Sequence, residues 1–164
     1  DAEYISQWEW ERLPDFHDRL ARVHGDMAEL AASSDGYERL DDPVSLHRRA
    51  VLALDGSLRL TDSLQARQSH QVEWTFRIPF GQAELVDGGA RVRDESLGNR
   101  SLWILPLGDF RPVGRIESGY CYGGTSMTTT PTVVFQTEMG DVRQFQFAVL
   151  LAPGESPPAV ASPD

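Results

Sequence analysis

The sequence has no lysine, a single cysteine and no long apolar run. All fifteen basic residues are arginine; a bias toward GC-rich codons explains this most simply, and selection for planar carboxylate-binding groups is the alternative. Cys121 has no second cysteine with which to form an internal disulfide, and it lacks the neighbours of a reactive thiol. Because no segment approaches the roughly 20 apolar residues that cross a bilayer, we expect a soluble protein without a membrane partner.

Positive charge is also scarce. The 25 acidic and 15 basic residues give a formal net charge of −10, and the pI is about 4.8. Such a surface repels nucleic acids and anionic lipids at neutral pH, so a nucleic-acid partner is not expected. A polyanion needs a local cluster of arginines, for which the candidates are Arg39, Arg48, Arg49, Arg111 and Arg115.

The usual sequence motifs of a complete active site are missing too. The histidines have no metal-ligand spacing, and we predict no bound metal and no cofactor. There is no nucleophile elbow, phosphate-binding loop or dinucleotide fingerprint. Asp41 and Asp42, like Glu9 and Glu11, lie in polar contexts typical of a solvated surface rather than of paired catalytic acids. The chain does not look like a complete enzyme.

Period-two alternation is the strongest pattern that the sequence does contain. Between positions 70 and 80 every second residue is apolar: Val72, Trp74, Phe76, Ile78 and Phe80. The pattern recurs at positions 143–151, on Phe145, Phe147, Val149 and Leu151. Each segment predicts a strand with one buried face. Residues 15–23 fit either a short helix or an irregular strand.

Turn signals separate these and other short strands. Asp55–Gly56 and Asp87–Gly88 predict hairpins, and Gly140–Asp141 predicts a third, between strands at 133–138 and 143–151. Further strands are expected at 28–33, 44–49, 51–54, 58–60, 83–86, 91–93, 102–105 and 116–122. We therefore predict an all-β, antiparallel sandwich of about ten or more strands over residues 1–151. The Pro-, Ala- and Ser-rich residues 152–164 are expected to be a disordered tail.

One ordered set of motifs resembles a known family. Residues 34–49 read S-D-G-Y-E-R-L-D-D-P-V-S-L-H-R-R, and L-R-L-T-D-S-L-Q-A and H-Q-V-E-W-T-F-R-I-P follow at 58–66 and 70–79. With Gln7–Trp10 upstream and Gly119–Gly123 downstream, the order and spacing resemble the C-terminal β-sandwich domain of heparinase II/III-like polysaccharide lyases. Ser34 stands where that family has a histidine, so a catalytic contribution from this position is not expected.

The resemblance implies a function for a longer chain. In such lyases a helical toroid joins the sandwich, and uronic-acid polysaccharides are cleaved by β-elimination. The resemblance places the main acid–base groups upstream, so no catalytic residue is assigned here and the isolated chain is expected to be inactive. The implied partners are an acidic polysaccharide and the toroid. The location stays open, and a bacterial periplasm or the medium outside the cell are the candidates.

Five residues are the candidates for contact with the substrate: Tyr37, His47, Arg48, Arg49 and Tyr120. Tyrosine offers a ring for stacking on sugars, and arginine offers a fork that fits a uronate carboxylate. Each also has an ordinary structural explanation as a turn, strand or surface residue. Two other interpretations therefore stay open: a non-catalytic carbohydrate-binding module, and a structural sandwich that docks another domain.

Overall fold

A computed structural model of the chain describes residues 3–4, 10–12, 15–98, 100–107, 111–123, 126–140 and 144–159. Within these residues lie thirteen strands and one short 3-10 helix, η1 (Glu95–Leu97). The strands are β1 (Glu3–Tyr4), β2 (Trp10–Arg12), β3 (Phe16–His24), β4 (Met27–Ser34), β5 (Ser45–Ala53), β6 (Leu58–Gln65), β7 (Gln71–Arg77), β8 (Gln82–Val86), β9 (Gly89–Arg93), β10 (Ser101–Leu107), β11 (Val113–Gly123), β12 (Ser126–Glu138) and β13 (Gln144–Gly154). The described part contains no helix long and apolar enough to span a membrane.

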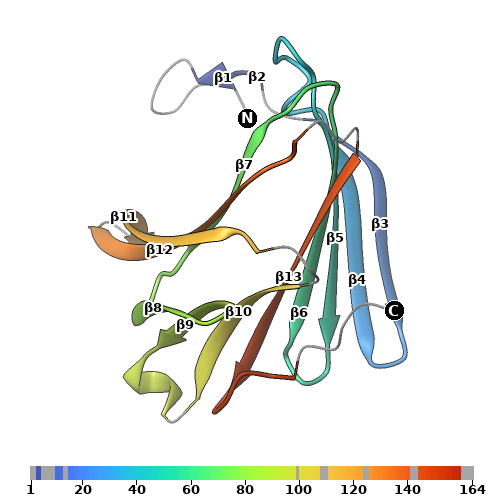
Figure 1. Ribbon diagram of the computed structural model, residues 1–164. Coiled ribbons are helices and arrows are strands. Elements are labelled where there is room, and N and C mark those ends of the chain that lie inside the picture. The colour runs from blue at the N-terminus through green and yellow to red at the C-terminus, as the bar shows by residue number, and fades with distance from the viewer. Residues whose placement is uncertain are drawn as a thin grey trace.

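Two sheets of unequal width form the sandwich. The large sheet has eight strands in the order β3-β4-β5-β6-β13-β10-β9-β8, and the small sheet has three in the order β11-β12-β7. A separate pair joins β1 and β2, and all the ladders are antiparallel. Figure 1 shows the small sheet lying across one part of the large one, with β3 and β4 far from it. The predicted all-β antiparallel sandwich is confirmed.

The core lies where the small sheet covers the large one. Ile104 and Phe147 of the large sheet and Val133 of the small sheet are at most 1% exposed. Trp74 stacks on Phe147 with 3.7 Å between ring centroids and an interplanar angle of 23°. Burying each of these large apolar side chains contributes about 1.5–3 kcal/mol, so the contact between the sheets is the main source of stability.

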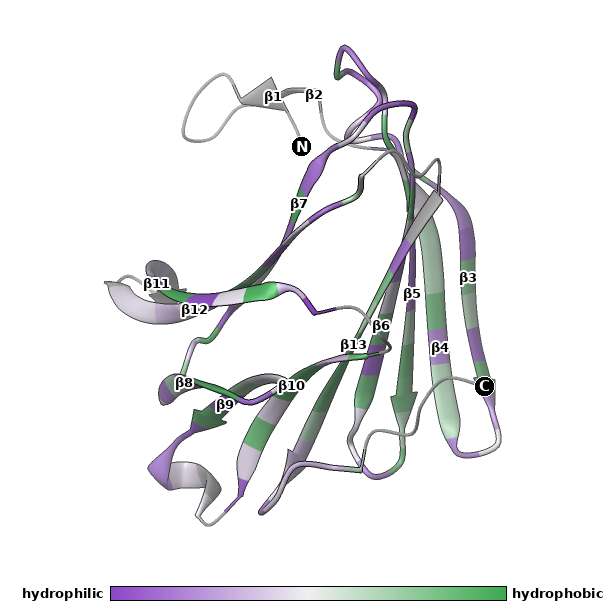
Figure 2. Cartoon of the chain, viewed as in Figure 1, coloured by the Kyte–Doolittle hydropathy of each residue, from purple (hydrophilic) through white to green (hydrophobic). Residues whose placement is uncertain are grey.

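Beyond the small sheet, the inner face of the large sheet continues, and no described residue covers it. The rung Ala21–Leu30–Ala50–Leu60 crosses β3 to β6, and Leu60 packs against the core, which puts the whole rung on the inner face. Leu30 is nevertheless 60% exposed. The neighbouring rung carries Arg22 and Glu29 on the outer face. The half-sheet β3–β5 therefore has a polar outer face and an exposed apolar inner face, and Figure 2 shows the apolar positions along β4 and β5.

The hairpin expected at Gly140–Asp141 is wrong. β12 pairs with β11 and β7, whereas β13 pairs with β6 and β10, so the connection crosses from one sheet to the other. The hairpins at Asp55–Gly56 and Asp87–Gly88 are confirmed as β5–β6 and β8–β9. A turn motif predicts that the chain reverses direction, but it does not predict to which sheet the next strand belongs.

Several boundaries also differ from the expected ones. The strands expected at 44–49 and 51–54 form the single strand β5. Residues 15–23, expected to be a short helix or an irregular strand, lie almost wholly in the irregular strand β3, in which Asp18 has φ 49° next to a register shift. The strand expected to reach Phe80 ends at Arg77. The chain then turns at Gly81, which has φ 69° and where any Cβ would lie 2.1 Å from the Arg93 carbonyl oxygen. β13 continues to Gly154, past the expected end at residue 151.

A matched pair of truncations on the inner face of the large sheet tests this description. We expect Ile104→Ala to lower the free energy of unfolding by about 2–5 kcal/mol, because it leaves a cavity beneath the small sheet. Leu30→Ala on the uncovered half is expected to cost less than about 1 kcal/mol, because that side chain is already solvated. Urea denaturation of both variants measures the difference. An equal loss in Leu30→Ala would mean that this half of the sheet is covered in the isolated chain.

Candidate functional site

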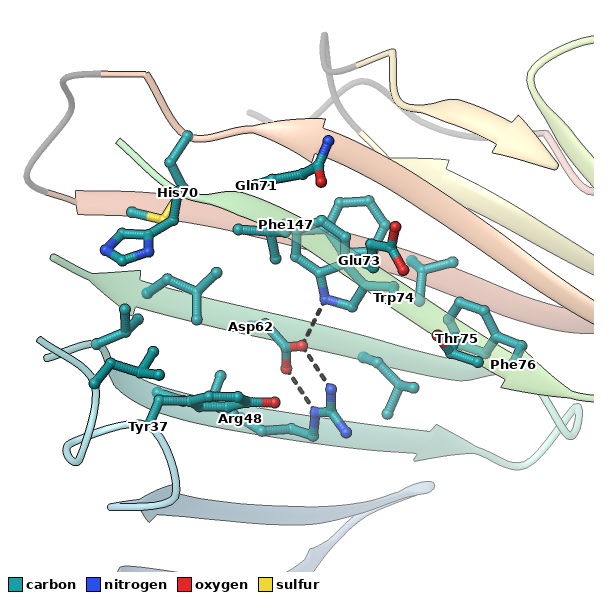
Figure 3. Close-up of a pocket in the computed structure, with 18 residues that line it drawn as sticks. Tyr37, Arg48, Asp62, His70, Gln71, Glu73, Trp74, Thr75, Phe76 and Phe147 are labelled. Carbon is teal, nitrogen blue, oxygen red and sulfur yellow. Dashed lines mark hydrogen bonds and ion pairs between the residues drawn. The ribbon is translucent and has the colours of Figure 1, made fainter. Parts of the chain in front are cut away.

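A hollow of about 440 Å³ lies between β7 and the inner faces of β5, β6 and β13. Its walls are mostly apolar, with Leu46 of β5 and Val149 of β13 among them. The polar side chains that line it include Tyr37, Arg48, Asp62 and His70, shown together in Figure 3. These residues come from two strands and two connecting loops, so the fold of the sandwich itself assembles the site.

Asp62 is the buried centre of the polar groups. It is 4% exposed, and its two oxygens accept hydrogen bonds from Nε and Nη2 of Arg48, each at 2.6 Å. The indole Nε1 of Trp74 donates a third hydrogen bond, 2.7 Å long, to Oδ2. Because Arg48 lies on β5 and Trp74 on β7, this one carboxylate links the large sheet to the small sheet (Figure 3).

Arg48 is held by this pairing on one side only. The carboxylate of Asp62 raises the pKa of the guanidinium above its ordinary value, through hydrogen bonds and charge attraction. Nη1 donates no hydrogen bond to a described residue, and the side chain is half exposed. The Tyr37 ring lies beside it in Figure 3. The remaining edge of Arg48 is therefore able to donate to an anion or a carbonyl oxygen.

A second buried carboxylate ties together the loops around the hollow. Asp42 is 8% exposed, and its Oδ2 accepts hydrogen bonds from the backbone N–H groups of Arg67 (3.2 Å) and Gln68 (2.9 Å). The same oxygen lies 2.7 Å from Nε2 of His70. The hydrogen bond to His70 is the main cause that lowers the pKa of Asp42. The solvated role expected for Asp42 is thus wrong, because the residue fastens the loop that carries Tyr37 to the β6–β7 connection.

The structure brings two of the five expected contact residues together. Tyr37 and Arg48 line the same hollow. His47 and Arg49 lie on the opposite face of β5, where His47 Nδ1 is 3.0 Å from Ser33 Oγ and Arg49 donates to Glu29 at 2.5 Å. Tyr120 lies on β11 of the small sheet and is 58% exposed. A single contact surface made of all five residues does not form.

Three of the five arginines that were candidates for binding a polyanion are dispersed and paired. Arg48 and Arg49 alternate across β5, and each has a carboxylate partner, Asp62 or Glu29. Arg115 lies in the small sheet, where it binds Glu73 at 2.9 Å and Glu117 at 2.5 Å. The outer-face pairs lie across neighbouring strands, as in a solvated sheet. Of these three arginines only Arg48 lines the hollow, and its charge is paired with Asp62, so these residues offer an acidic polymer little net positive charge there.

Two residues that the sequence motifs did not single out, Asp62 and Asp42, are central to the site. Asp62 lies on the same face of β6 as Leu58 and Leu60, so it is a carboxylate within a row of apolar side chains. This alternation could have predicted a buried carboxylate with hydrogen-bond partners, because a buried charge needs partners. Asp42 gave no comparable signal, since its partners lie at positions 67–70. Among the described residues, no group of three His, Cys, Asp or Glu side chains is placed to share a metal ion.

Comparison with known proteins places these features in context. The model of a family described as heparinase II/III-like, C-terminal, matches residues 2–155. No curated protein matches the sequence. The fold is similar to that of heparan sulfate lyase HepC from Pedobacter heparinus, with a TM-score of 0.73 at 11% identity over 89% of this chain and 22% of that one. A heparinase III gives 0.68 at 10% identity over 88% and 22%.

A less similar structure is 4-alpha-glucanotransferase from Thermococcus litoralis, with a TM-score of 0.54 at 11% identity over 87% of this chain and 24% of that one. At such identities the likeness concerns the fold alone. The chain spans about a fifth of the length of the HepC and heparinase III chains, 22% in each case.

The link that Asp62 makes between the sheets is testable by a double-mutant cycle. We expect Asp62→Ala to lower the free energy of unfolding by about 2 kcal/mol or more, because charged hydrogen bonds contribute about 1.5–3 kcal/mol each. Trp74→Phe keeps the ring stacking and removes only the N–H donor. Urea denaturation of the single and double variants should give a coupling of at least about 0.5 kcal/mol. Purely additive losses would contradict the link.

The pH dependence of stability tests the role of Asp42. A lowered pKa in the folded state means that the stabilisation is complete above the ordinary value of 3.8 and is lost as the pH falls through the folded value. We expect Asp42→Asn to lose less stability than the wild type between neutral pH and pH values below 3.8. Asp41→Asn is the control for the loss of one surface charge. Thermal unfolding at a series of pH values measures the curves, and parallel curves for Asp42→Asn and the wild type would contradict the assignment.

Proposed function

The chain belongs to the heparinase II/III-like C-terminal family, and we propose that it is the sandwich part of a longer polysaccharide lyase that acts on uronic-acid polysaccharides by β-elimination. The uncovered inner face of β3–β5 carries the proposal, because an exposed apolar face continuous with a core is typical of a surface that another part of a protein covers. The similarity of the fold to heparan sulfate lyase HepC supports the proposal, because this chain matches only 22% of that longer chain.

In the proposed lyase the acid–base chemistry belongs to another part of the polypeptide. β-Elimination needs a base for the proton next to the carboxylate, a group that neutralises that carboxylate, and an acid for the leaving oxygen. Around the hollow, Asp42 engages His70, and Asp62 engages Arg48. These pairs support the fold rather than form a complete catalytic set. We assign the chemistry to a helical toroid in the same polypeptide and the supporting wall to this chain.

A second candidate role is direct contact with the polysaccharide by Tyr37 and Arg48. The open Nη1 edge of Arg48, beside the Tyr37 ring at the hollow, favours it. A uronate carboxylate at this edge would meet one guanidinium and one aromatic face. His47, Arg49 and Tyr120 point to other surfaces and take no part in this candidate site. In either role, the proposed enzyme is bacterial and works in the periplasm or outside the cell.

An activity comparison tests the proposed function. Residues 1–164 alone, incubated with uronic-acid polymers, are expected to produce no ultraviolet absorbance from unsaturated sugar ends, whereas the longer polypeptide produces it. In the longer polypeptide, Arg48→Ala separates the two roles: a role in contact lowers kcat/KM by about tenfold or more. Arg49→Ala, on the opposite face of β5, is the matched control and should leave kcat/KM unchanged. Activity of residues 1–164 alone would contradict the proposal, as would a longer polypeptide without lyase activity.

A further inference from the structure

The small sheet ends in an open edge at β7. Among the described residues, β7 is paired with β12 on one side only. The ladder is bounded by two hydrogen bonds, from Ile78 N–H to the Pro131 carbonyl (3.0 Å) and from Met139 N–H to the His70 carbonyl (2.8 Å). In an antiparallel ladder the bonded positions alternate along each strand. The backbone N–H and C=O groups of the even-numbered residues of β7 therefore point toward β12, and those of the odd-numbered residues point to the open side.

The hollow described above runs along this open edge. Gln71, Glu73 and Thr75 line it, and all three are odd-numbered residues whose backbone groups face the open side. The carboxylate of Glu73 accepts a hydrogen bond from Arg115 of the small sheet at 2.9 Å, so the carboxylate does not account for the place of Glu73 in the lining of the hollow, and we ascribe that place to its backbone. One wall of the hollow is therefore a row of peptide groups that have no ladder partner in the described part of the chain. Such an edge is a template for pairing with another strand.

The floor beneath the open edge is apolar and extends past it. A second hollow, of about 860 Å³, lies over β3, β4 and β5 and shares Tyr37, Leu46 and Arg48 with the first. Leu30 and Ala50 line it, and Val23 and Leu52 on the same inner face are 80% and 47% exposed. This surface continues the interface that the two sheets already form. Packed sheets lie about 10 Å apart, with about 4.8 Å between strands, so the next strand beside β7 would lie over this floor.

We propose that an extended segment of the longer polypeptide, outside these 164 residues, pairs with the open edge of β7 and widens the small sheet over β3–β5. The segment is a β-strand with an apolar side chain at every second position, since these residues must face Leu30, Leu46 and Ala50. A backbone carbonyl or hydroxyl of the segment accepts from Nη1 of Arg48. The Arg48–Asp62 pair then becomes fully enclosed with its hydrogen bonds satisfied.

The inference rests on the proposed function only in requiring a longer polypeptide, and it excludes the second candidate role, in which Nη1 of Arg48 contacts a sugar. It explains why the inner face of an eight-stranded sheet meets only three strands. It also explains why the outer face of the same half-sheet is polar, with Glu29 bound by Arg22 and Arg49, while the inner face is apolar. The two faces differ because only one of them is covered in the proposed assembly.

Residue-resolved hydrogen exchange tests the inference, with an internal control in the same strand. In residues 1–164 alone, the amides of Gln71, Glu73, Thr75 and Arg77 are expected to exchange rapidly, whereas those of Val72, Trp74 and Phe76 are protected by β12. In the longer polypeptide we expect the odd-numbered amides to slow by at least about 100-fold, because each becomes hydrogen-bonded. Protection of the even-numbered amides in both samples confirms that β7 is folded.

The possible outcomes separate the inference from the proposed function. Odd-numbered amides that exchange equally fast in both samples overturn the added strand, even if the longer polypeptide is an active lyase. Protection in residues 1–164 alone also overturns it: if the protection grows with protein concentration, a second copy is the occupant, and if it does not, a segment of this chain is. Slow odd-numbered amides in a polypeptide that cleaves no polysaccharide support the strand and reject the lyase.

Discussion

The inner face of the large sheet is apolar over a greater width than the small sheet covers. Eight strands lie against three, and the covered part holds Ile104, Val133 and Phe147 at no more than 1% exposure while Leu30 remains 60% exposed. Burial of apolar area is the main stabilising term in folding, so this division decides which half of the sandwich is rigid. The hollow, the open edge of β7 and the proposed partner strand all follow from this difference in width.

Polar groups mark the border between the covered and uncovered halves. Asp62 joins Arg48 of the large sheet to Trp74 of the small sheet, and Asp42 joins the loop after β4 to the loop before β7. Removing either carboxylate leaves buried donors without a partner, which costs more than the net contribution of the hydrogen bonds themselves. These interactions fix the position of β7, and therefore of its open edge, above the apolar floor.

Local signals in the sequence predicted much of this fold. Alternation placed Trp74 and Phe147 on buried faces, and Asp-Gly turns located two hairpins, because both signals act between residues close in sequence. The passage from β12 to β13 was not predictable in this way, since a turn at Gly140 fits a hairpin and a crossing equally well. The burial of Asp42 depends on partners more than twenty residues away, so its polar neighbourhood suggested a solvated surface instead.

Carbene footprinting of exposed side chains tests the half-open sandwich most directly. In residues 1–164 alone, Val23, Leu30 and Leu52 should be labelled heavily, and Ile104 should not be labelled, in keeping with exposures of 80%, 60%, 47% and 0%. In the longer polypeptide, labelling of the first three residues should fall to the level of Ile104. Unchanged labelling of Leu30 in the longer polypeptide would show that its inner face stays open to solvent, and would contradict the account.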